Sequence, residues 1–108
     1  MKTIMVRYKT SETQADANEA LVHAVFDELR ATKPGGLRYA TYRLPDRVSF
    51  VHIATVESPD ANPLLVLPAF KAFQKDIKDR CVEPPVATEL SPVEAYGSVE
   101  TITVGSAS

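Results

Sequence analysis

The sequence predicts an α+β fold of the ferredoxin-like type, with strands and helices in the order βαββαβ. Four segments alternate apolar and polar residues with the period of two that is typical of strands. Two longer segments repeat apolar residues at helical spacing, and runs rich in proline and glycine separate the elements. This order corresponds to a four-stranded antiparallel sheet with two helices on one face.

The first strand is predicted over residues 3–9 and the first helix over residues 12–32. In the strand, Ile4, Val6 and Tyr8 fall on one face. Hydroxyls between residues 10 and 13 are candidates to cap the helix. The apolar stripe of the helix comprises Leu21, Val22, Val25, Phe26 and Leu29.

The next two strands are predicted over residues 37–44 and 48–56, joined by a three-residue turn over residues 45–47 that begins with proline. This loop length pairs Leu44 with Val48. It places Tyr42, Phe50 and His52 on one face of the sheet. The other face then carries Leu37, Tyr39, Val51 and Ile53.

The second helical region is predicted to open with a short turn over residues 63–67. It restarts at Pro68 and runs to about Cys81, with Arg80 on the solvent side. A prolyl pair at positions 84 and 85 ends it. A last strand is expected over residues 86–97, interrupted at Pro92. We therefore expect one domain over residues 1–98, followed by an arm and flexible tail over residues 99–108.

Composition narrows the classes of protein to which the chain can belong. The formal net charge of −2 argues against nucleic acid or an anionic membrane as the main partner. Cys81 is the single cysteine, so no disulfide within the chain is expected. The sequence shows no signal peptide and no apolar run of membrane-spanning length, so a cytoplasmic protein is expected. The motifs typical of zinc, phosphate and dinucleotide binding are missing from it, so neither a metal nor a cofactor is predicted.

One face of the predicted sheet has no helix to cover it. That face would carry four apolar or aromatic side chains, from Leu37, Tyr39, Val51 and Ile53. Monomers rarely expose an apolar patch of this size. The sequence therefore predicts a homodimer that pairs through this sheet face.

Two neighbouring segments resemble the antibiotic biosynthesis monooxygenase superfamily. They are the strand over residues 50–57 and the segment over residues 64–73, in which Pro68 precedes Phe70 and Phe73 in the family's Pro–x–Phe–x–x–Phe pattern. The resemblance covers roughly residues 2–97 and implies a dimeric α/β barrel. It also implies a pocket between the sheet and the helices of each subunit. Val56 stands where members often carry a tryptophan.

The candidate site residues lie on the face that the resemblance assigns to this pocket. We expect His52 to be catalytic, because an imidazole titrates near neutral pH. An alternative is a packed histidine satisfied by a carbonyl or by Tyr42. The polar amide of Asn18, on the apolar edge of the first helix, needs a partner or a cavity. The predicted ligand-binding residues are Asn18, Tyr42, Phe50 and Phe70.

Three functions remain open from the sequence. The first is a monooxygenase without cofactor, acting on a small aromatic or quinone-like substrate whose proton His52 accepts. The second is a non-enzymatic dimeric barrel that binds a small hydrophobic ligand or has a structural role. The missing tryptophan favours this second function. The third is haem binding and degradation, with His52 as the candidate iron ligand.

Overall fold

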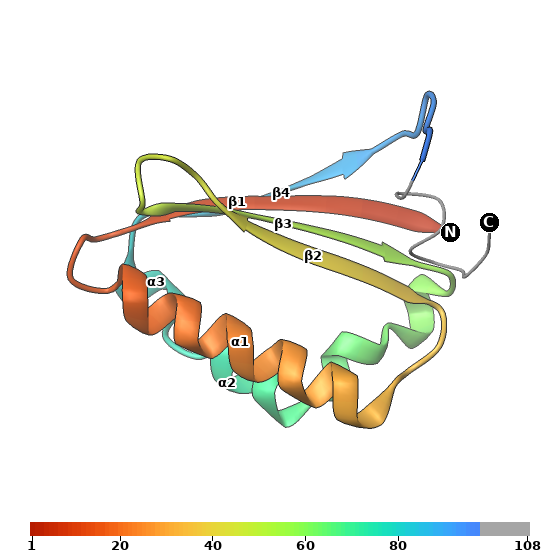
Figure 1. Cartoon of the computed structure of the whole chain (residues 1–108), viewed down its shortest axis with the longest axis horizontal. Helices are drawn as coiled ribbons and strands as arrows, with labels where there is room; N and C mark the ends of the chain where they lie inside the picture. Colours follow the sequence, from red (N-terminus) through yellow and green to blue (C-terminus); the bar gives the residue numbers. More distant parts are fainter. Residues whose placement is uncertain (98–108) are drawn as a thin grey trace.

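The computed structural model describes residues 1–97 and confirms the predicted ferredoxin-like α+β fold. A four-stranded antiparallel sheet in the order β2-β3-β1-β4 carries its helices on one face (Figure 1). The predicted arm and tail over residues 99–108 lie outside the described residues. In chain order, the elements are β1 (Lys2–Thr10), α1 (Ala15–Thr32), β2 (Leu37–Arg43), β3 (Ser49–Val56), the short 3-10 helices η1 (Pro59–Ala61) and η2 (Pro63–Val66), α2 (Pro68–Gln74), α3 (Ile77–Arg80) and β4 (Cys81–Leu90).

Helix α1 begins at Ala15, three residues later than predicted. The residues before it form a turn, in which the carbonyl of Ser11 accepts from the Gln14 amide at 3.1 Å. The hydroxyls of Ser11 and Thr13 bond to each other at 3.3 Å and do not cap the helix. The turn is also tied to the far end of the chain, because the Ser11 amide donates to the carbonyl of Arg80 at 3.0 Å.

The second helical region is broken where the sequence predicted continuity. Lys75 is extended, and Asp76 has a φ of 61°, which separates α2 from α3. The Arg80 side chain turns inward and donates to the carbonyls of Phe73 and Lys75 at 2.5 and 3.1 Å. It therefore bonds carbonyls that α2 leaves open at its end. The prediction of a solvent-facing Arg80 was wrong, since only 8% of this residue is exposed.

Strand β4 starts directly at Cys81 and contains both prolines that were predicted to form a break. It is an edge strand, and its register against β1 shifts between the pairs Arg7–Val86 and Lys9–Glu83. The prolines fall in this irregularity, where they do not interrupt a regular ladder of hydrogen bonds. The strand ends at Leu90, before the predicted interruption at Pro92.

The register of the β2–β3 hairpin differs by one residue from the prediction. Leu44 bonds to Ser49 at 2.9 Å, which makes the loop four residues long, over 45–48. The carboxylate of Asp46 accepts from the amides of Val48 and Ser49 at 3.0 and 2.8 Å, so Val48 belongs to the loop. Arg47 takes a positive φ of 68° there.

This shift exchanges the two faces of β2. Tyr39 lies on the helix side of the sheet, where its ring stacks on Phe26 of α1 at 5.1 Å between centroids. Tyr42 pairs with Val51 and is 57% exposed on the other side. The predictions that Tyr42 faces the pocket and that Leu37 and Tyr39 face outward were therefore wrong.

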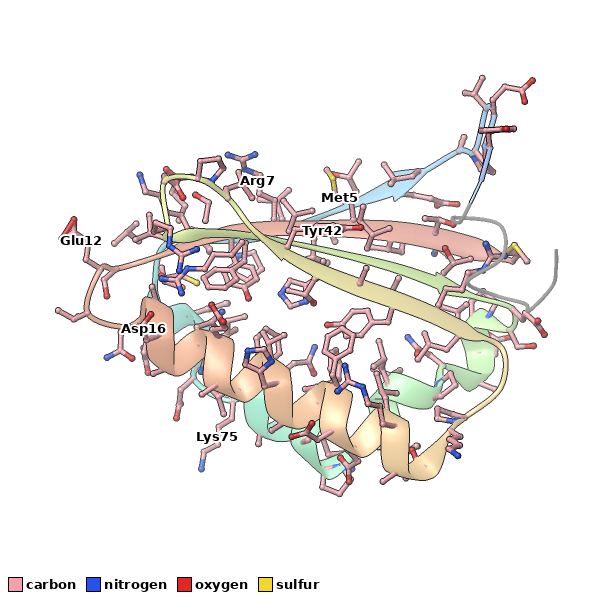
Figure 2. The ribbon with its side chains drawn as sticks, viewed as in Figure 1. Met5, Arg7, Glu12, Asp16, Tyr42 and Lys75 are labelled. Atoms are coloured by element: carbon pink, nitrogen blue, oxygen red, sulfur yellow. The ribbon has the colours of Figure 1, made fainter. Side chains whose placement is uncertain are left out.

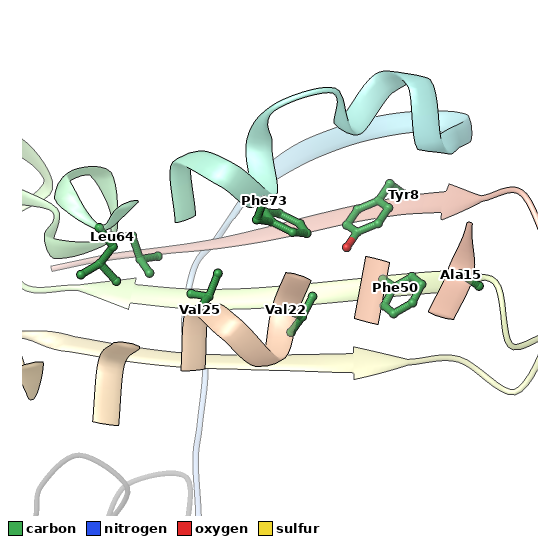
Figure 3. Packing of buried hydrophobic residues seen from close by; sticks show 8 residues of the cluster. Tyr8, Ala15, Val22, Val25, Phe50, Leu64 and Phe73 are labelled. Carbon is green, nitrogen blue, oxygen red and sulfur yellow. The ribbon is translucent and has the colours of Figure 1, made fainter. Parts of the chain in front are cut away.

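The core lies between the sheet and the helices (Figure 3). The rings of Tyr8 and Phe50 stack at 5.5 Å near its centre. Burial of each large apolar side chain contributes about 1.5–3 kcal/mol of stability. The buried cluster comprises Tyr8, Ala15, Val22, Val25, Phe50, Leu64, Leu67 and Phe73.

The outer face of the sheet carries no helix (Figure 1). Met5 and Arg7 of β1 project from it, on the side away from α1 (Figure 2). Met5 pairs with Ile53, and Arg7 pairs with Val51. We call the group formed by Met5, Tyr42, Val51, Ile53 and Val86 the outer patch.

Candidate functional site

A cavity of about 450 Å³ lies between the sheet and the segment from η2 to α3. Its walls are mainly apolar, a composition typical of pockets for small organic molecules. Polar side chains on the walls come from Tyr8, Tyr39, His52, Asn62 and Gln74. The apolar lining comprises Ile4, Val6, Ala54, Val56, Leu64, Leu65, Phe70, Phe73, Ile77 and Pro85.

His52 is the centre of a hydrogen-bond network on the sheet wall of this cavity. The residue is 5% exposed, and both ring nitrogens have partners. Nε2 lies 2.8 Å from the Tyr8 hydroxyl. Nδ1 lies 2.7 Å from the Tyr39 hydroxyl and 3.0 Å from that of Thr41.

The network continues from Tyr8 into the core. The amide nitrogen of Asn18 donates to the Tyr8 hydroxyl at 2.8 Å, and its oxygen accepts from Nε of Arg80 at 3.0 Å. Asn18 is 0% exposed. The chain of contacts therefore runs from a buried cation to the cavity wall through Asn18, Tyr8 and His52.

Burial shifts the pKa values of the titratable side chains in the network so that their neutral forms are favoured. Desolvation lowers the pKa of His52 to about 4, so the imidazole is uncharged at neutral pH. Desolvation likewise raises the pKa of Tyr39 to about 12. Burial also raises the pKa of Tyr8, against the opposing effect of its hydrogen bond from Asn18. Arg80 is therefore the charged member of the network.

A second, more open groove of about 520 Å³ lies between α1 and the edge strand β2. Tyr39 and Thr41 line it on the sheet side, so the Tyr39 ring separates the groove from the cavity. An ion pair closes part of it, with the Arg43 guanidinium 2.7 Å from Glu19. This bond from Arg43 is the main reason that the pKa of Glu19 is lowered.

The structure brings two of the predicted site residues together at the cavity, His52 and Phe70. Phe50 is 1% exposed in the core and lines the groove. Asn18 sits behind Tyr8, so it reaches the cavity only through that hydroxyl. Tyr42 lies on the opposite face of the sheet, in the outer patch.

Sequence reasoning missed the contributions of Tyr8, Tyr39 and Arg80 to this site. Tyr8 was grouped with Ile4 and Val6 on one face of the first strand, but that face was not assigned to the pocket and Tyr8 was given no partner. A signal was available for it, because Tyr8 and His52 lie on neighbouring strands and share a face in the register that pairs Val6 with His52. For Arg80 the sequence offers no such signal, because its inward turn depends on the break at Asp76.

The described part of the chain holds no group of three His, Cys, Asp or Glu side chains that could bind a metal ion. Across residues 1–97, none of the helices is both long enough and apolar enough to cross a membrane.

Comparison with known proteins places this fold beside the antibiotic biosynthesis monooxygenases. A candidate antibiotic biosynthesis monooxygenase from Nitrosomonas europaea superposes with a TM-score of 0.72 at 15% identity, covering 87% of this chain and 100% of that one. A variant of SnoaB, a cofactor-independent oxygenase from Streptomyces nogalater, gives 0.63 at 19%, covering 87% and 94%. A dimeric ferredoxin-like protein of unknown function from Jannaschia gives 0.63 at 15%, covering 84% and 98%.

No protein-family model matches the sequence, and the search of curated proteins found no match. The likeness is therefore one of fold, and it agrees with the resemblance seen in residues 50–57 and 64–73.

Proposed function

We propose that the cavity binds a small aromatic molecule with an ionisable enol or phenol and that the protein oxidises it with O₂ without a cofactor. One observation carries the proposal. A connected cluster of two tyrosine hydroxyls and a buried imidazole lies on the wall of an otherwise apolar cavity. The oxygenase activity of SnoaB, which shares the fold, supports it.

The chemistry follows from where charge develops. Ionisation of an enol, whose proton passes to water, places negative charge on its oxygen and on the carbon that reacts with O₂. A hydroxyl donor at the cavity wall stabilises this enolate, and low polarity around the donor strengthens the effect. For an anthrone-type substrate, the ring CH₂ becomes C=O with one atom of O₂. The second oxygen atom leaves as water with the two hydrogens.

In this proposal His52 does not contact the reacting atoms but orients the hydroxyls to which it is hydrogen-bonded. The sequence suggested that it accepts the substrate proton, but both of its nitrogens are already bonded within the protein. A base with a pKa of about 4 also has little tendency to accept a proton at neutral pH. The hydroxyl of Tyr39, a residue that lines the cavity, is the group that would contact the substrate oxygen.

Oxygen uptake with anthrone tests the proposal. Loss of one donor to an oxyanion lowers turnover by a factor of about 100, so we expect Tyr39→Phe and His52→Ala to lower kcat/KM by about 10- to 100-fold. Tyr42→Phe, which removes a hydroxyl from the same strand but on the outer face, is the matched control. Equal rates in Tyr39→Phe, His52→Ala and wild type would contradict the proposed site.

A second function, binding without catalysis, is favoured by the same full occupation of His52. No lone pair of its ring faces the cavity, so the wall offers hydrogen bonds but not a strong base. An aromatic ligand that binds in the micromolar range without any oxygen uptake would identify the protein as a binding module. Haem ligation receives less support, because iron would have to displace Tyr8 or Tyr39 from the imidazole.

We also propose that the outer patch pairs two copies of the chain. The patch consists of apolar and aromatic side chains, with Arg7 between Val51 and Val86. It lies on a face that no helix covers and includes Val86 at 62% exposure. The Jannaschia protein that shares this fold is dimeric. A second copy would bury the same patch on both subunits about a two-fold axis.

Sedimentation equilibrium tests the pairing. We expect a dimer for the wild type and a monomer for Ile53→Glu, which places a charge at the centre of the outer patch. Val66→Glu is the matched control, because Val66 is 72% exposed on η2, away from the sheet. A dimer that survives Ile53→Glu but not Val66→Glu would place the interface on the helix side.

A further inference from the structure

We propose that Arg80 and Asn18 are positioning residues that fix His52 in the tautomer with its proton on Nδ1, so that the Tyr39 hydroxyl can donate to an oxygen acceptor on the ligand. The part that concerns the ligand rests on the proposed use of the cavity. The part that concerns the tautomer does not depend on any ligand.

Arg80 determines the donor-to-acceptor direction of the hydrogen bonds in the network. A guanidinium has hydrogen-bond donors and no acceptor, so the Asn18 atom 3.0 Å from Arg80 Nε must be the amide oxygen. Bonds to the carbonyls of Phe73 and Lys75 hold the guanidinium in place. A flipped amide would set two donors against each other at a residue with 0% exposure. The Asn18 amide nitrogen therefore points at Tyr8.

The hydrogen bonds of Tyr8 then determine which nitrogen of His52 is the acceptor. Its oxygen accepts the Asn18 N–H at 2.8 Å, so its own proton goes to its other partner, His52 Nε2, also at 2.8 Å. With a proton on Nε2, two donors would face the Tyr8 oxygen, and the Tyr8 proton would have no further acceptor among the described residues. Because Tyr8 is 2% exposed, water does not readily supply one. Nε2 is thus the acceptor, and the proton of the neutral ring is on Nδ1.

At Nδ1 the ring donates toward two hydroxyls, those of Tyr39 and Thr41. These hydroxyls also interact with each other. Three protons meet two oxygens, so one hydroxyl proton is left over. When Nδ1 donates to Thr41 and Thr41 donates to Tyr39, the remaining proton is that of Tyr39, the residue of the two that lines the cavity.

The arrangement selects a class of ligand. A carbonyl or enolate oxygen accepts the outward proton, and the chain of aligned donors that begins at a cation strengthens that bond. A ligand group that can only donate meets a donor and is disfavoured.

The tautomer can be measured in the unliganded protein by long-range ¹H–¹⁵N correlation of the histidine rings. In wild type at pH 7, Nδ1 of His52 is expected to resonate as a protonated nitrogen and Nε2 as an unprotonated one. His23→Gln assigns the signals, since the chain has two histidines. A wild-type ring with its proton on Nε2, or an even mixture, overturns the proposal.

Asn18→Asp tests whether the hydrogen-bond donor at position 18 determines the tautomer of His52. A carboxylate has no donor, so Tyr8 must donate to it, and His52 must then donate from Nε2. We expect the tautomer to reverse, and an unchanged Nδ1 proton would overturn the relay. If this variant fails to fold, Arg80→Lys and Arg80→Met replace it. Lysine at position 80 still donates to the Asn18 oxygen, so we expect the wild-type tautomer of His52. Methionine cannot donate, so the Asn18 amide is free to flip and we expect a mixture of the two His52 tautomers. Identical spectra for the two variants would overturn the relay.

Two probes of similar shape test the ligand class, 1-tetralone with a carbonyl acceptor and tetralin without one. Tyr39→Phe leaves the tautomer unchanged, because Thr41 still accepts from Nδ1. We expect it to weaken 1-tetralone binding about fivefold to tenfold and to leave tetralin binding unchanged. Equal effects on both probes would overturn the donor role. If neither probe binds wild type while the tautomers behave as expected, the ligand-binding proposal fails and the relay stands.

Discussion

Neighbouring residues of the same strands differ in burial and hydrogen bonding between the two faces of the sheet. On the helix side, both ring nitrogens of His52 have partners and the Tyr39 hydroxyl is bonded to one of them, although the two residues lie beside a cavity. On the outer side, Tyr42 is 57% exposed, and its neighbours Val51 and Ile53 are covered by no helix. Polar groups are buried and partnered on one face, whereas apolar groups lie uncovered on the other.

The difference indicates what each face is for. A buried polar network is stable only when each member is satisfied, so the network around His52 fixes one arrangement of donors and acceptors. An uncovered apolar face has no such internal order and is completed by a partner. This difference supports the two proposals above, in which the helix side recognises a small molecule and the outer side pairs two subunits.

The largest expected contrast between the faces is in stability. Phe50→Ala removes a ring that is 1% exposed and stacked on Tyr8, so it should lower the free energy of unfolding by about 3–5 kcal/mol. Tyr42→Ala, in the Ile53→Glu background that separates the subunits, should cost less than about 1 kcal/mol. Urea denaturation of both variants measures the contrast. Equal losses would mean that Tyr42 is packed within the subunit.

The pH dependence of stability sharpens the comparison at His52. Its pKa is lowered to about 4 in the folded protein, below the ordinary 6.5, so the unfolded chain binds a proton more readily. The contribution of His52 to the free energy of unfolding is therefore fully present above pH 6.5. It falls by about 3 kcal/mol as the pH drops to 4.

The matched control for this pH effect is His52→Asn, in which that part of the pH dependence should vanish. The effect of Asp46, whose pKa its bonds to Ser49 and Val48 lower to about 2, is common to both proteins and cancels. Parallel stability curves for wild type and variant between pH 6.5 and 4 would show that His52 is accessible to protons in the folded state.

The smallest expected contrast is between two hydroxyls on one strand. Tyr39→Phe removes an oxygen 2.7 Å from His52 Nδ1 and should cost about 1 kcal/mol, because Thr41 still accepts from the ring. Tyr42→Phe should change stability by less than about 0.5 kcal/mol. Thermal unfolding of the pair distinguishes them, and an equal cost would contradict the separation of the two faces.

The sequence was sufficient for the order of the elements and for the grouping of Ile4, Val6 and Tyr8 on one face of β1, because period-two and helical patterns report burial directly. It was not sufficient for the hairpin register. Val48 has the residue type of a strand, yet the Asp46 carboxylate holds its amide in the loop. One additional loop residue exchanged Tyr39 and Tyr42 between the faces.

The buried network could be predicted only in part. The sequence identified His52 as a candidate and Asn18 as a polar residue in need of a partner. It could not identify Arg80 as that partner, since 62 positions separate the two residues and the contact depends on a break in the helical region. Contacts of this kind arise from tertiary packing and have no local pattern in the sequence.

The most direct test of the account is a crystal structure of the protein with 1-tetralone bound. The account predicts the ligand in the cavity between the sheet and α2, with its carbonyl oxygen within hydrogen-bond distance of the Tyr39 hydroxyl. A ligand bound on the outer patch, or one in the cavity with its oxygen turned away from Tyr39, would contradict the assignment of recognition to the helix side.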